Sequence, residues 1–445
     1  MHIIELNDRN ISLRNQTEVL VQSPGFANIV DKQVTFGDEA RQIAKLHPRH
    51  TYNQFWSQLS LDPLVNSNNH FRHQADLAFA HLNEIASQHA LKDEVIFAVP
   101  SNYNRNQLSI LLGLVQSCEF DAVGLVDMPL LLAGKMAGTI AGKDGATSPA
   151  VYLDIQLHQS VLTTFVPGDG NVTRDKVVQI PGTGLIALFD AWANMVTDEF
   201  IKQSRFDPQH NAETEQYVHN QLGLWLSQVK QDNEILMEIN NKGSVYQARV
   251  NRGHFEQRVR NIFGRVKEEL ESLAGNNFSL YLPDNHAELP GLPLYLNNIS
   301  RIADGQLLEN CLQHMDHIRG EPGSMNFITT LPLSGQTRDK KSDLPDSGPS
   351  HILVNNRAYP LPTMLQFGPV NGNMPSGSSV IQVEAVGGSG DLKISLTDDG
   401  AQLDVQGVGK VQLNGSKVSA RELLKLGDII KLPGSDSLLQ LIQVE

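Results

Sequence analysis

The sequence predicts an α/β domain followed by a small all-β domain, on three observations. In residues 1–333, apolar runs typical of strands alternate with the apolar period of helices, which is the pattern of an α/β domain. Residues 334–350, SGQTRDKKSDLPDSGPS, have no apolar periodicity and indicate a solvated polar linker. In residues 351–445, short apolar runs alternate with Gly-rich turns, which is typical of a small β-sandwich or barrel.

Composition places the chain among globular proteins and argues against several partners. Its 445 residues exceed what one core usually organises, and its contents of 40% hydrophobic and 19% charged residues are ordinary. A formal net charge of -14 disfavours a nucleic-acid partner, because phosphate contacts need a concentrated basic surface. No apolar run is as long as a membrane span and no secretory signal is visible, so we expect a cytoplasmic protein without membrane insertion.

Strands and helices are expected in alternation along the first part of the chain. Three strand-like runs predict a β-meander at residues 2–6, 19–29 and 33–36. An amphipathic helix is predicted at residues 70–90. The next elements are predicted as strand, helix, strand, helix and strand hairpin, at residues 93–101, 104–120, 121–129, 129–138 and 149–168. This order favours largely parallel strand pairing.

Two further helices and a hairpin are expected before the linker. The helices are predicted at residues 214–235 and 252–275, and the hairpin between them turns at the Asn-Lys-Gly of residues 241–243. No internal repeat is evident. Cys118 and Cys311 lack the spacing of a zinc site or a disulfide framework, so we interpret both as packing residues.

Three motifs, in this order, resemble the ATPase domain of the seventy-kilodalton heat-shock chaperone family, which belongs to the actin-like superfamily. They are GDEARQIAKLHPRHT at residues 37–51, VPSNYNRNQ at 99–107 and NRGHFE at 251–256, and they span most of the first part of the chain. The resemblance implies a two-lobed actin-like domain with a nucleotide cleft. It also implies four sets of residues that carry the family's chemistry, and each set can be compared with this chain.

The first phosphate loop of that family has the pattern IDLGTTNS, whose Gly and hydroxyl residues approach the phosphates. This chain has IELNDRNI, in which Glu5 replaces the Asp and Asn7 the Gly. Asp8 and Arg9 take the two hydroxyl positions. Asp8 would place a carboxylate against the phosphates, where like-charge repulsion in a partly dry cleft disfavours binding, and Arg9 would offset only part of this repulsion.

The second phosphate loop of the family has the pattern DLGGGT, and this chain has DIQLHQ. Asp154 is retained, but Gln156, Leu157 and His158 occupy the glycine positions and Gln159 the Thr position. Glycine is needed there because it permits positive φ and close approach of the backbone to phosphate. The three side chains are therefore expected to fill the volume where phosphate would bind.

The other two sets are also altered. The family's catalytic Lys falls on Trp56, and its Glu falls on Met128, with Asp127 one residue earlier. An aromatic ring and a thioether cannot orient the attacking water or hold the γ-phosphate. The adenosine loop, VGGSTRIP in the family, corresponds to LPDNHAEL at residues 282–289, without the paired glycines. ATP hydrolysis by the family mechanism is therefore not expected.

The C-terminal part has a weaker resemblance, to a forkhead-associated domain. Residues 411–432 contain an Asn-Gly turn, then a Gly-Asp turn and a final strand, as at the end of that fold. The Arg and the Ser-Arg-x-His run that read phosphothreonine are missing at FGP (residues 367–369) and GSSV (377–380). The resemblance implies the fold without phosphopeptide binding.

Two alternatives for this part stay open. The Asn-Gly and Gly-Asp dipeptides are also ordinary hairpin turns, which would need no family relationship. The other alternative is the chaperone family's own peptide-binding β-sandwich. The polar character of residues 334–350 argues against it, because that family joins its domains by a short apolar linker.

Several residues invite a chemical interpretation. His158, close in sequence to Asp154, is a candidate general base or ligand, but a hydrogen-bonded filler is favoured. His314 and His317, with Cys311 nearby, have the spacing of metal ligands on a helix, but a solvated helix face is favoured because no second ligand cluster is evident.

Two segments near the expected cleft also have competing interpretations. Phe55, Trp56 and Leu59 form an apolar stripe, which favours core packing over a plug in the cleft or a surface for a partner. The PGTGL of residues 181–185 retains two glycines and gives weak support for anion binding.

These comparisons predict a heat-shock-chaperone-like pseudo-ATPase that binds proteins as a scaffold or adaptor, without a cofactor. A divergent ATPase that holds ATP and Mg²⁺ in a non-standard pose, through Asp154, Arg9 and residues 182–184, is the alternative. A third hypothesis is an adaptor in a peripheral membrane complex. The expected degenerate cleft comprises Glu5, Asn7, Arg9, Asp154, Gln156, His158, Gly182 and Gly184.

Overall fold

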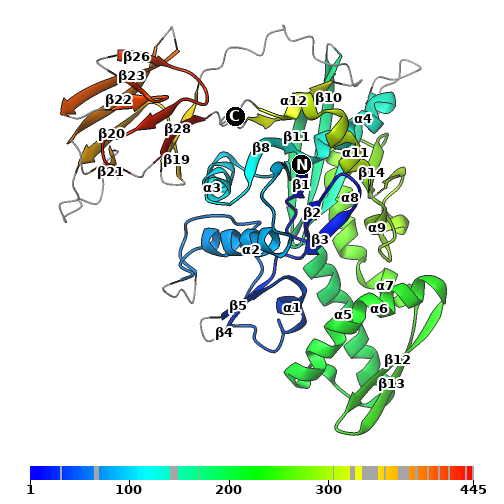
Figure 1. Cartoon of the computed structure of the whole chain (residues 1–445). Helices are drawn as coiled ribbons and strands as arrows, with labels where there is room; N and C mark the ends of the chain where they lie inside the picture. The colour runs from blue at the N-terminus through cyan, green and yellow to red at the C-terminus, as the bar shows by residue number, and fades with distance from the viewer. Residues whose placement is uncertain are drawn as a thin grey trace.

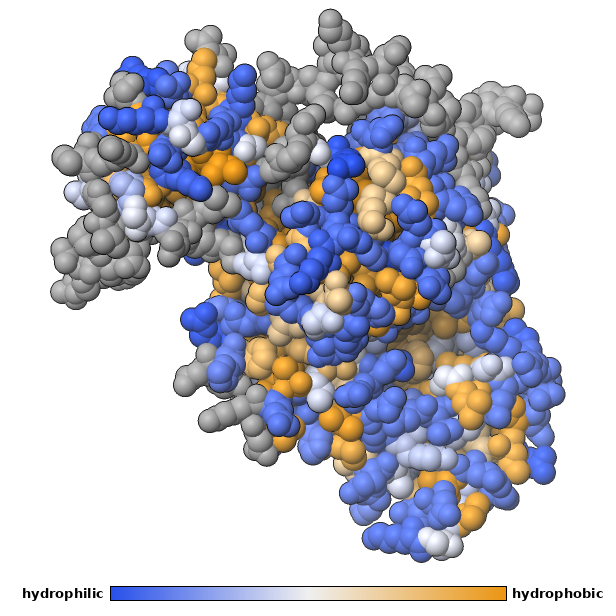
Figure 2. All heavy atoms as spheres, in the orientation of Figure 1, coloured by the Kyte–Doolittle hydropathy of each residue, from blue (hydrophilic) through white to orange (hydrophobic). Residues whose placement is uncertain are grey.

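The computed structural model of the chain mixes helices and sheets, as expected for an α/β protein (Figure 1). It describes residues 1–30, 33–64, 70–140, 149–168, 170–303, 305–320, 326–332, 349–354, 357–368, 380–385, 389–397, 400–408, 411–418, 421–435 and 438–442. None of the helices formed by these residues combines the length and the apolar character needed to span a bilayer. Hydrophilic residues cover most of the described surface on the face shown in Figure 2.

The first sheet has six strands in the order β16-β8-β7-β1-β2-β3. Its N-terminal half is an antiparallel meander, and the pairings of β1 with β7, β7 with β8 and β8 with β16 are parallel. The strands are β1 (His2–Glu5), β2 (Ile11–Arg14), β3 (Val19–Ser23), β7 (Glu94–Val99), β8 (Asp121–Asp127) and β16 (Phe327–Ile328).

The second sheet has the order β15-β14-β9-β10-β11-β17, and its first five strands repeat the arrangement β8-β7-β1-β2-β3 of the first sheet. The sixth strand differs, because β17 pairs antiparallel with β11, whereas β16 lies at the opposite edge beside β8. Strands β9 to β11 form the antiparallel meander, and β9 pairs with β14 and β14 with β15 in parallel. The strands are β9 (Ala150–Ile155), β10 (Gln159–Gly168), β11 (Asn171–Pro181), β14 (Ser279–Pro283), β15 (Ile299–Ile302) and β17 (Thr330–Pro332). The chain therefore contains a duplicated sheet topology, which the sequence did not reveal.

Helices cover both sheets and a shared core joins them. Helices α2 (Gln74–Gln88) and α3 (Arg105–Gln116) pack in the core of the first sheet, and α5 (Leu185–Ser204) and α8 (Arg260–Ala274) pack in the core of the second. A third apolar cluster contains side chains of both sheets and of α4 (Met128–Ile140), such as Ile96, Met136 and Tyr152. The apolar contacts of this cluster hold the two sheets together.

Two smaller units extend from the sheets. One contains β4 (Ala27–Val30), β5 (Gln33–Phe36), β6 (Thr51–Tyr52) and α1 (Gly37–Gln42). The other contains the 3₁₀ helix η1 (Pro208–His210), α6 (Ala212–Gln231) and the predicted hairpin, β12 (Glu234–Asn241) and β13 (Ser244–Asn251), whose turn residues Lys242 and Gly243 have positive φ.

Several sequence predictions are wrong in detail. The expected single meander is two sheets, because β4 pairs with β5 and β6 instead of continuing from β3. The helix expected at residues 252–275 breaks at Val259 into α7 (Arg252–Arg258) and α8. Helix α5 was not predicted, nor were the short helices α9 (Asp284–Ala287), α10 (Leu292–Tyr295), α11 (Gln306–Gln313) and α12 (Met315–Ile318).

The C-terminal part consists of two sheets that share one apolar core. The six-stranded sheet contains β18 (His351–Val354), β19 (Arg357–Pro360), β24 (Gln412–Leu413), β25 (Ser416–Lys417), β27 (Ile429–Lys431) and β28 (Leu438–Ile442). The five-stranded sheet contains β20 (Thr363–Gly368), β21 (Val380–Glu384), β22 (Ser389–Thr397), β23 (Gly400–Val408) and β26 (Arg421–Leu424). Residues 333–348, most of the predicted linker, lie outside the described residues, as do 369 and 377–379 of the expected phosphothreonine positions.

The predicted turns of this part are hydrogen-bonded to each other. Asn414 and Gly415 have positive φ, and so has Gly427. The Asn414 side chain donates to the carboxylate of Asp428 at 2.8 Å and accepts from the backbone N–H of Ile429 at 2.9 Å. The Asn-Gly and Gly-Asp dipeptides therefore form one linked pair of turns.

An ion pair links the two large sheets. Asp127, at the end of β8, is fully buried and accepts hydrogen bonds from the Ser101 hydroxyl at 2.9 Å and the Leu130 N–H at 3.2 Å. Its other oxygen lies 2.7 Å from Nη1 of Arg174, which comes from β11 of the second sheet and also lies over the ring of Phe327.

Substituting Arg174 with Met should destabilise the protein, because it leaves the buried Asp127 carboxylate without its cation. We expect the free energy of unfolding, measured with denaturant, to fall by about 3 kcal/mol. The matched control is Arg249→Met, which removes an exposed arginine 3.4 Å from Glu234 and should cost about 0.5 kcal/mol. Equal losses in the two variants would contradict a structural role for the Asp127–Arg174 pair.

Candidate functional site

Two hairpin turns at equivalent places in the duplicated sheets meet face to face. The turn between β1 and β2 is closed by a hydrogen bond from the Asn10 N–H to the Asn7 carbonyl, at 2.9 Å. The turn between β9 and β10 is closed by one from the Gln156 N–H to the Gln159 carbonyl, also at 2.9 Å. These are the turns in which the sequence predicted two degenerate phosphate loops.

The carboxylate of Asp154 lies at the centre of this contact. The side-chain amide of Asn7 donates to both of its oxygens at 3.0 Å, and the side-chain amide of Gln156 donates to one of them at 3.0 Å. All three residues are buried. A buried carboxylate needs hydrogen-bond donors, and Asp154 receives them from both turns. These hydrogen bonds therefore link the two sheets.

Asp8 makes a second bond across the contact. Its Oδ1 accepts the backbone N–H of Leu157 at 2.8 Å, whereas its buried Oδ2 has no hydrogen-bond partner among the described residues. Burial, with a smaller contribution from the neighbouring Asp154, raises the pKa of Asp8 to about 7, against the lowering by the Leu157 N–H and Arg9. The carboxylate that was expected to repel a phosphate therefore binds the amide of the opposite turn.

The remaining substituted side chains of the second turn also have partners within the protein. Gln156 and Asn102 exchange hydrogen bonds of 2.9 and 3.3 Å, and Gln159 donates to Gln156 at 3.1 Å. His158 bonds through Nε2 to the carbonyl of Asn53 at 2.8 Å, and burial lowers its pKa. A neutral His158 that donates to a carbonyl is a hydrogen-bonded filler, as the sequence favoured, and not a base poised beside Asp154.

Arg9 and Glu5 belong to a neighbouring cluster. The Arg9 guanidinium contacts both ring nitrogens of His286, with Nδ1 at 3.0 Å, and lies 3.9 Å from the carboxylate of Glu5. Glu5 is also 3.7 Å from Arg14. His286 is buried in α9, and burial and the Arg9 charge hold its pKa well below the usual value. The sequence placed the altered adenosine loop at residues 282–289, but it did not single out this histidine.

The glycines at positions 182 and 184 serve tight backbone packing. Gly182 has positive φ and its N–H donates to the His158 carbonyl at 2.9 Å. A Cβ on Gly184 would lie 2.4 Å from the Gln159 backbone nitrogen.

Helix α5 begins directly after this turn. Its first two N–H groups, of Leu185 and Ile186, donate to the carbonyls of Gln156 and Leu157 at 2.9 and 3.0 Å. Since amides at a helix N-terminus bind anions only when they are free, this arrangement argues against the anion site that the glycines suggested.

Other candidates from the sequence lie away from this contact. Phe55, Trp56 and Leu59 are almost completely buried in the core of the first sheet, so the interpretation as core packing is confirmed. The Trp56 indole donates to His81 at 3.1 Å. His314 terminates α11 and His317 lies in α12, so the two do not share one helix. His314 is buried, so the interpretation as a solvated helix face is wrong for this residue. The described residues contain no group of ligands that could hold a metal ion.

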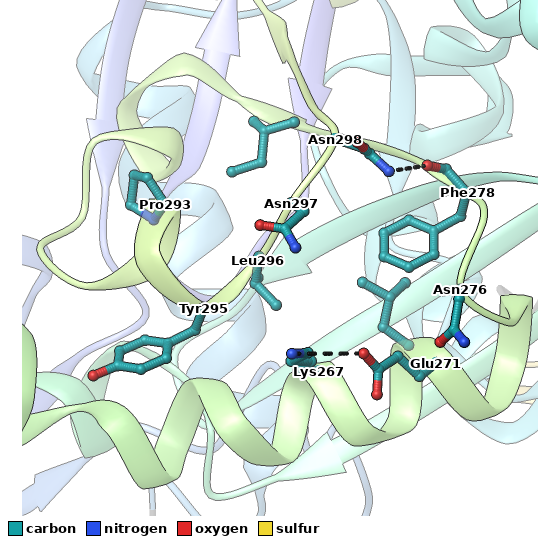
Figure 3. A pocket seen from close by; sticks show the side chains of 11 residues that line it. Lys267, Glu271, Asn276, Phe278, Pro293, Tyr295, Leu296, Asn297 and Asn298 are labelled. Atoms are coloured by element: carbon teal, nitrogen blue, oxygen red, sulfur yellow. Dashed lines mark hydrogen bonds and ion pairs between the residues drawn. The ribbon is translucent and has the colours of Figure 1, made fainter.

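A groove lies at a different place, beside the second sheet (Figure 3). It has a volume of about 720 Å³ and is lined by α8 residues such as Lys267 and Glu271 and by Asn276, Phe278 and Asn298. These loops precede β14 and β15, whereas Asp154 lies near the carboxyl end of β9, which is parallel to β14. Ligands of open α/β sheets bind at the carboxyl ends of the strands, so this groove is separate from the hairpin contact.

No protein-family model matches the chain, and no curated protein matches it. The resemblance to the heat-shock chaperone ATPase domain therefore stays a prediction from the motifs at residues 37–51, 99–107 and 251–256.

Substituting Asp8 with Asn should make the protein more stable at alkaline pH. The raised pKa of Asp8 means that the folded chain holds this proton more tightly than the unfolded chain, so wild-type stability falls as the pH rises from 3.8 through about 7. Asn cannot ionise and keeps an oxygen for the Leu157 N–H. We expect the variant to exceed wild type by on the order of 3 kcal/mol at about pH 8 and to match it near pH 4.

Denaturant unfolding at a series of pH values measures this difference. Asp198→Asn is the control, because Asp198 is exposed, and its effect should not vary with pH. A difference for Asp8→Asn that is constant from acid to alkaline pH would contradict the raised pKa of Asp8 in the folded state.

Proposed function

We propose that this protein is a heat-shock-chaperone-like pseudo-ATPase of actin-like fold that acts as a protein-binding scaffold or adaptor. The duplicated sheet topology and the motifs at residues 37–51, 99–107 and 251–256 support the fold. Two sheets that share a five-strand arrangement, joined by a core that both supply, are what a two-lobed body requires. The altered residues of the four expected chemical sets support the loss of hydrolysis.

One observation carries the proposal. The groups that would hold phosphates are bonded to each other: Asp154 to Asn7 and Gln156, Asp8 to the Leu157 N–H, and the first amides of α5 to carbonyls of the second turn. Binding a nucleotide there would require breaking these buried hydrogen bonds and leaving their partners unpaired. Each such loss costs about 1–3 kcal/mol, so the internal network competes with any nucleotide.

A second contact joins the lobes further out, between the segment after α1 and helix α6. The Lys45 N–H donates to Gln216 at 2.6 Å, and the Lys45 ammonium lies 3.2 Å from Asp190. Asn220 donates to the Gln42 carbonyl at 3.3 Å. We call this contact the outer clasp. With the hairpin contact, it supports a body that is closed without nucleotide, as a passive scaffold would be.

The C-terminal domain fits the same role. Its two sheets around one core are compatible with a forkhead-associated fold, and the linked Asn414 and Asp428 turns support that resemblance. Leu353 and Ile442 of its six-stranded sheet pack into the core of the first lobe, and Gln116 of α3 donates to Gln440 at 3.3 Å. We infer that the domain adds surface to the scaffold instead of reading phosphothreonine.

Titration with Mg-ATP tests the proposal against the divergent ATPase. We expect no heat of binding by calorimetry, no shift of the melting temperature at millimolar ATP and no phosphate release. Micromolar binding with measurable phosphate release would overturn the pseudo-ATPase. Proteins that co-purify with the full-length tagged chain should be retained equally with and without Mg-ATP, and release by ATP would indicate a working chaperone cycle instead.

Removing the outer clasp should loosen the lobes without creating a response to ATP. In the double variant Lys45→Ala, Gln216→Ala we expect backbone hydrogen exchange in α1 to speed up about tenfold, as the loss of one or two net hydrogen bonds predicts. Gln209→Ala is the control, because Gln209 donates to Asn194 within one lobe. Unchanged exchange in α1 would contradict the clasp.

A further inference from the structure

A second groove lies where the C-terminal domain meets the first lobe. It has a volume of about 360 Å³ and lies between α2, α3 and the first residue of β19, and Figure 1 shows β19 beside α3. Strand β19 is at the edge of its sheet, and its closest helical neighbour is α3. The groove is therefore complete only when the C-terminal domain is docked.

The floor of this groove is apolar. Ile110 and Leu114 of α3 and Ala75 and Phe79 of α2 line it, and Leu61 lines it with 41% of its surface exposed. The volume is at the lower end of the range for ligand sites, which is room for one or two side chains. Covering this floor with an apolar side chain removes it from water and is favourable.

The rim carries two arginines. Arg357 of β19 lies over the ring of Tyr359, with 5.2 Å from Cζ to the ring centroid, and among the described residues it has no carboxylate partner. Arg72 is 3.8 Å from Asp76, which also receives His73 at 3.0 Å. The lining of the groove thus contains two arginines and one carboxylate, that of Asp76, so the rim has a net positive charge on a chain whose formal charge is -14.

We propose that this groove binds a short segment of a partner protein in which an apolar side chain stands next to a carboxylate. The apolar side chain covers the floor formed by Ile110, Leu114 and Phe79, and the carboxylate pairs with Arg357 and Arg72. Guanidinium groups match carboxylates because their donors form a planar fork. The groove shares no residue with the hairpin contact, so this proposal can be tested separately from the proposed loss of nucleotide binding.

The size and charge of the groove favour this occupant over others. A pocket for one or two side chains suits an anchor residue at the centre of a larger interface. Two arginines are too few for a nucleic acid, which needs an extended basic surface. The apolar side chain and the carboxylate of the partner together give more specificity than either gives alone. A segment without an acid would leave Arg357 without a carboxylate partner.

Peptide display on the full-length chain tests the proposal. Libraries of random dodecapeptides should yield binders that combine an aliphatic or aromatic residue with a neighbouring Asp or Glu. By fluorescence polarisation, the best peptide should bind Arg357→Glu and Arg72→Glu about tenfold more weakly than wild type, as a reversed charge pair predicts. Arg249→Glu, a similarly exposed arginine of β13, is the control and should not change binding.

Charge reversal separates a direct contact from a loss of fold. A peptide whose acid is replaced by Lys should lose binding to wild type and regain part of it with Arg357→Glu. Arg357→Gln should weaken the acidic peptide without altering the melting temperature. The proposal is overturned if no peptide is enriched, or if the enriched peptides lack an acid. It is also overturned if Arg249→Glu weakens binding as much as Arg357→Glu does. Loss of self-association in Arg357→Glu, measured by sedimentation, would overturn it as well, because the occupant would then be a second copy of the chain.

Discussion

The contact of Asn7 and Gln156 with the Asp154 carboxylate is the interaction on which the rest of the structure depends. A carboxylate removed from water needs donors, and the Asn7 amide satisfies both oxygens from the opposite sheet. This fixes how the two hairpins meet. The Asp8 bond to the Leu157 N–H crosses between the same two hairpins.

A body closed in this way responds differently from a nucleotide-driven one. A ligand shifts a conformational equilibrium only as far as it binds one state better than the other. When the hairpins bond each other and the outer clasp holds Lys45 to Gln216, the closed state is already stabilised without a ligand. The two large sheets are then held in a constant relationship, as the proposed scaffold role requires.

Local patterns predicted the elements but not the relationships between them. The period of Leu77 and Leu82 predicted α2, and the Asn-Lys-Gly turn predicted the β12–β13 hairpin, because these signals lie within a few residues. The loss of glycine at Gln156 was readable in the same way. The bond from Asn7 to Asp154, 147 residues away, could not be predicted, because it depends on how the two sheets meet. Their common five-strand arrangement leaves no evident repeat in the sequence. His286 was missed for the same reason.

The separation of 147 residues between Asn7 and Asp154 has a consequence for how the chain is made. At synthesis rates of roughly 5–20 residues per second, the first hairpin leaves the ribosome on the order of ten seconds or more before its partner. During that interval the Asn7 amide has no Asp154 to donate to, and the Asp8 carboxylate has no Leu157 N–H to accept from. The last strand of the first sheet, β16 (Phe327–Ile328), is synthesised later still. The β8 edge of the first sheet therefore stays unpaired until the residues of β16 are synthesised.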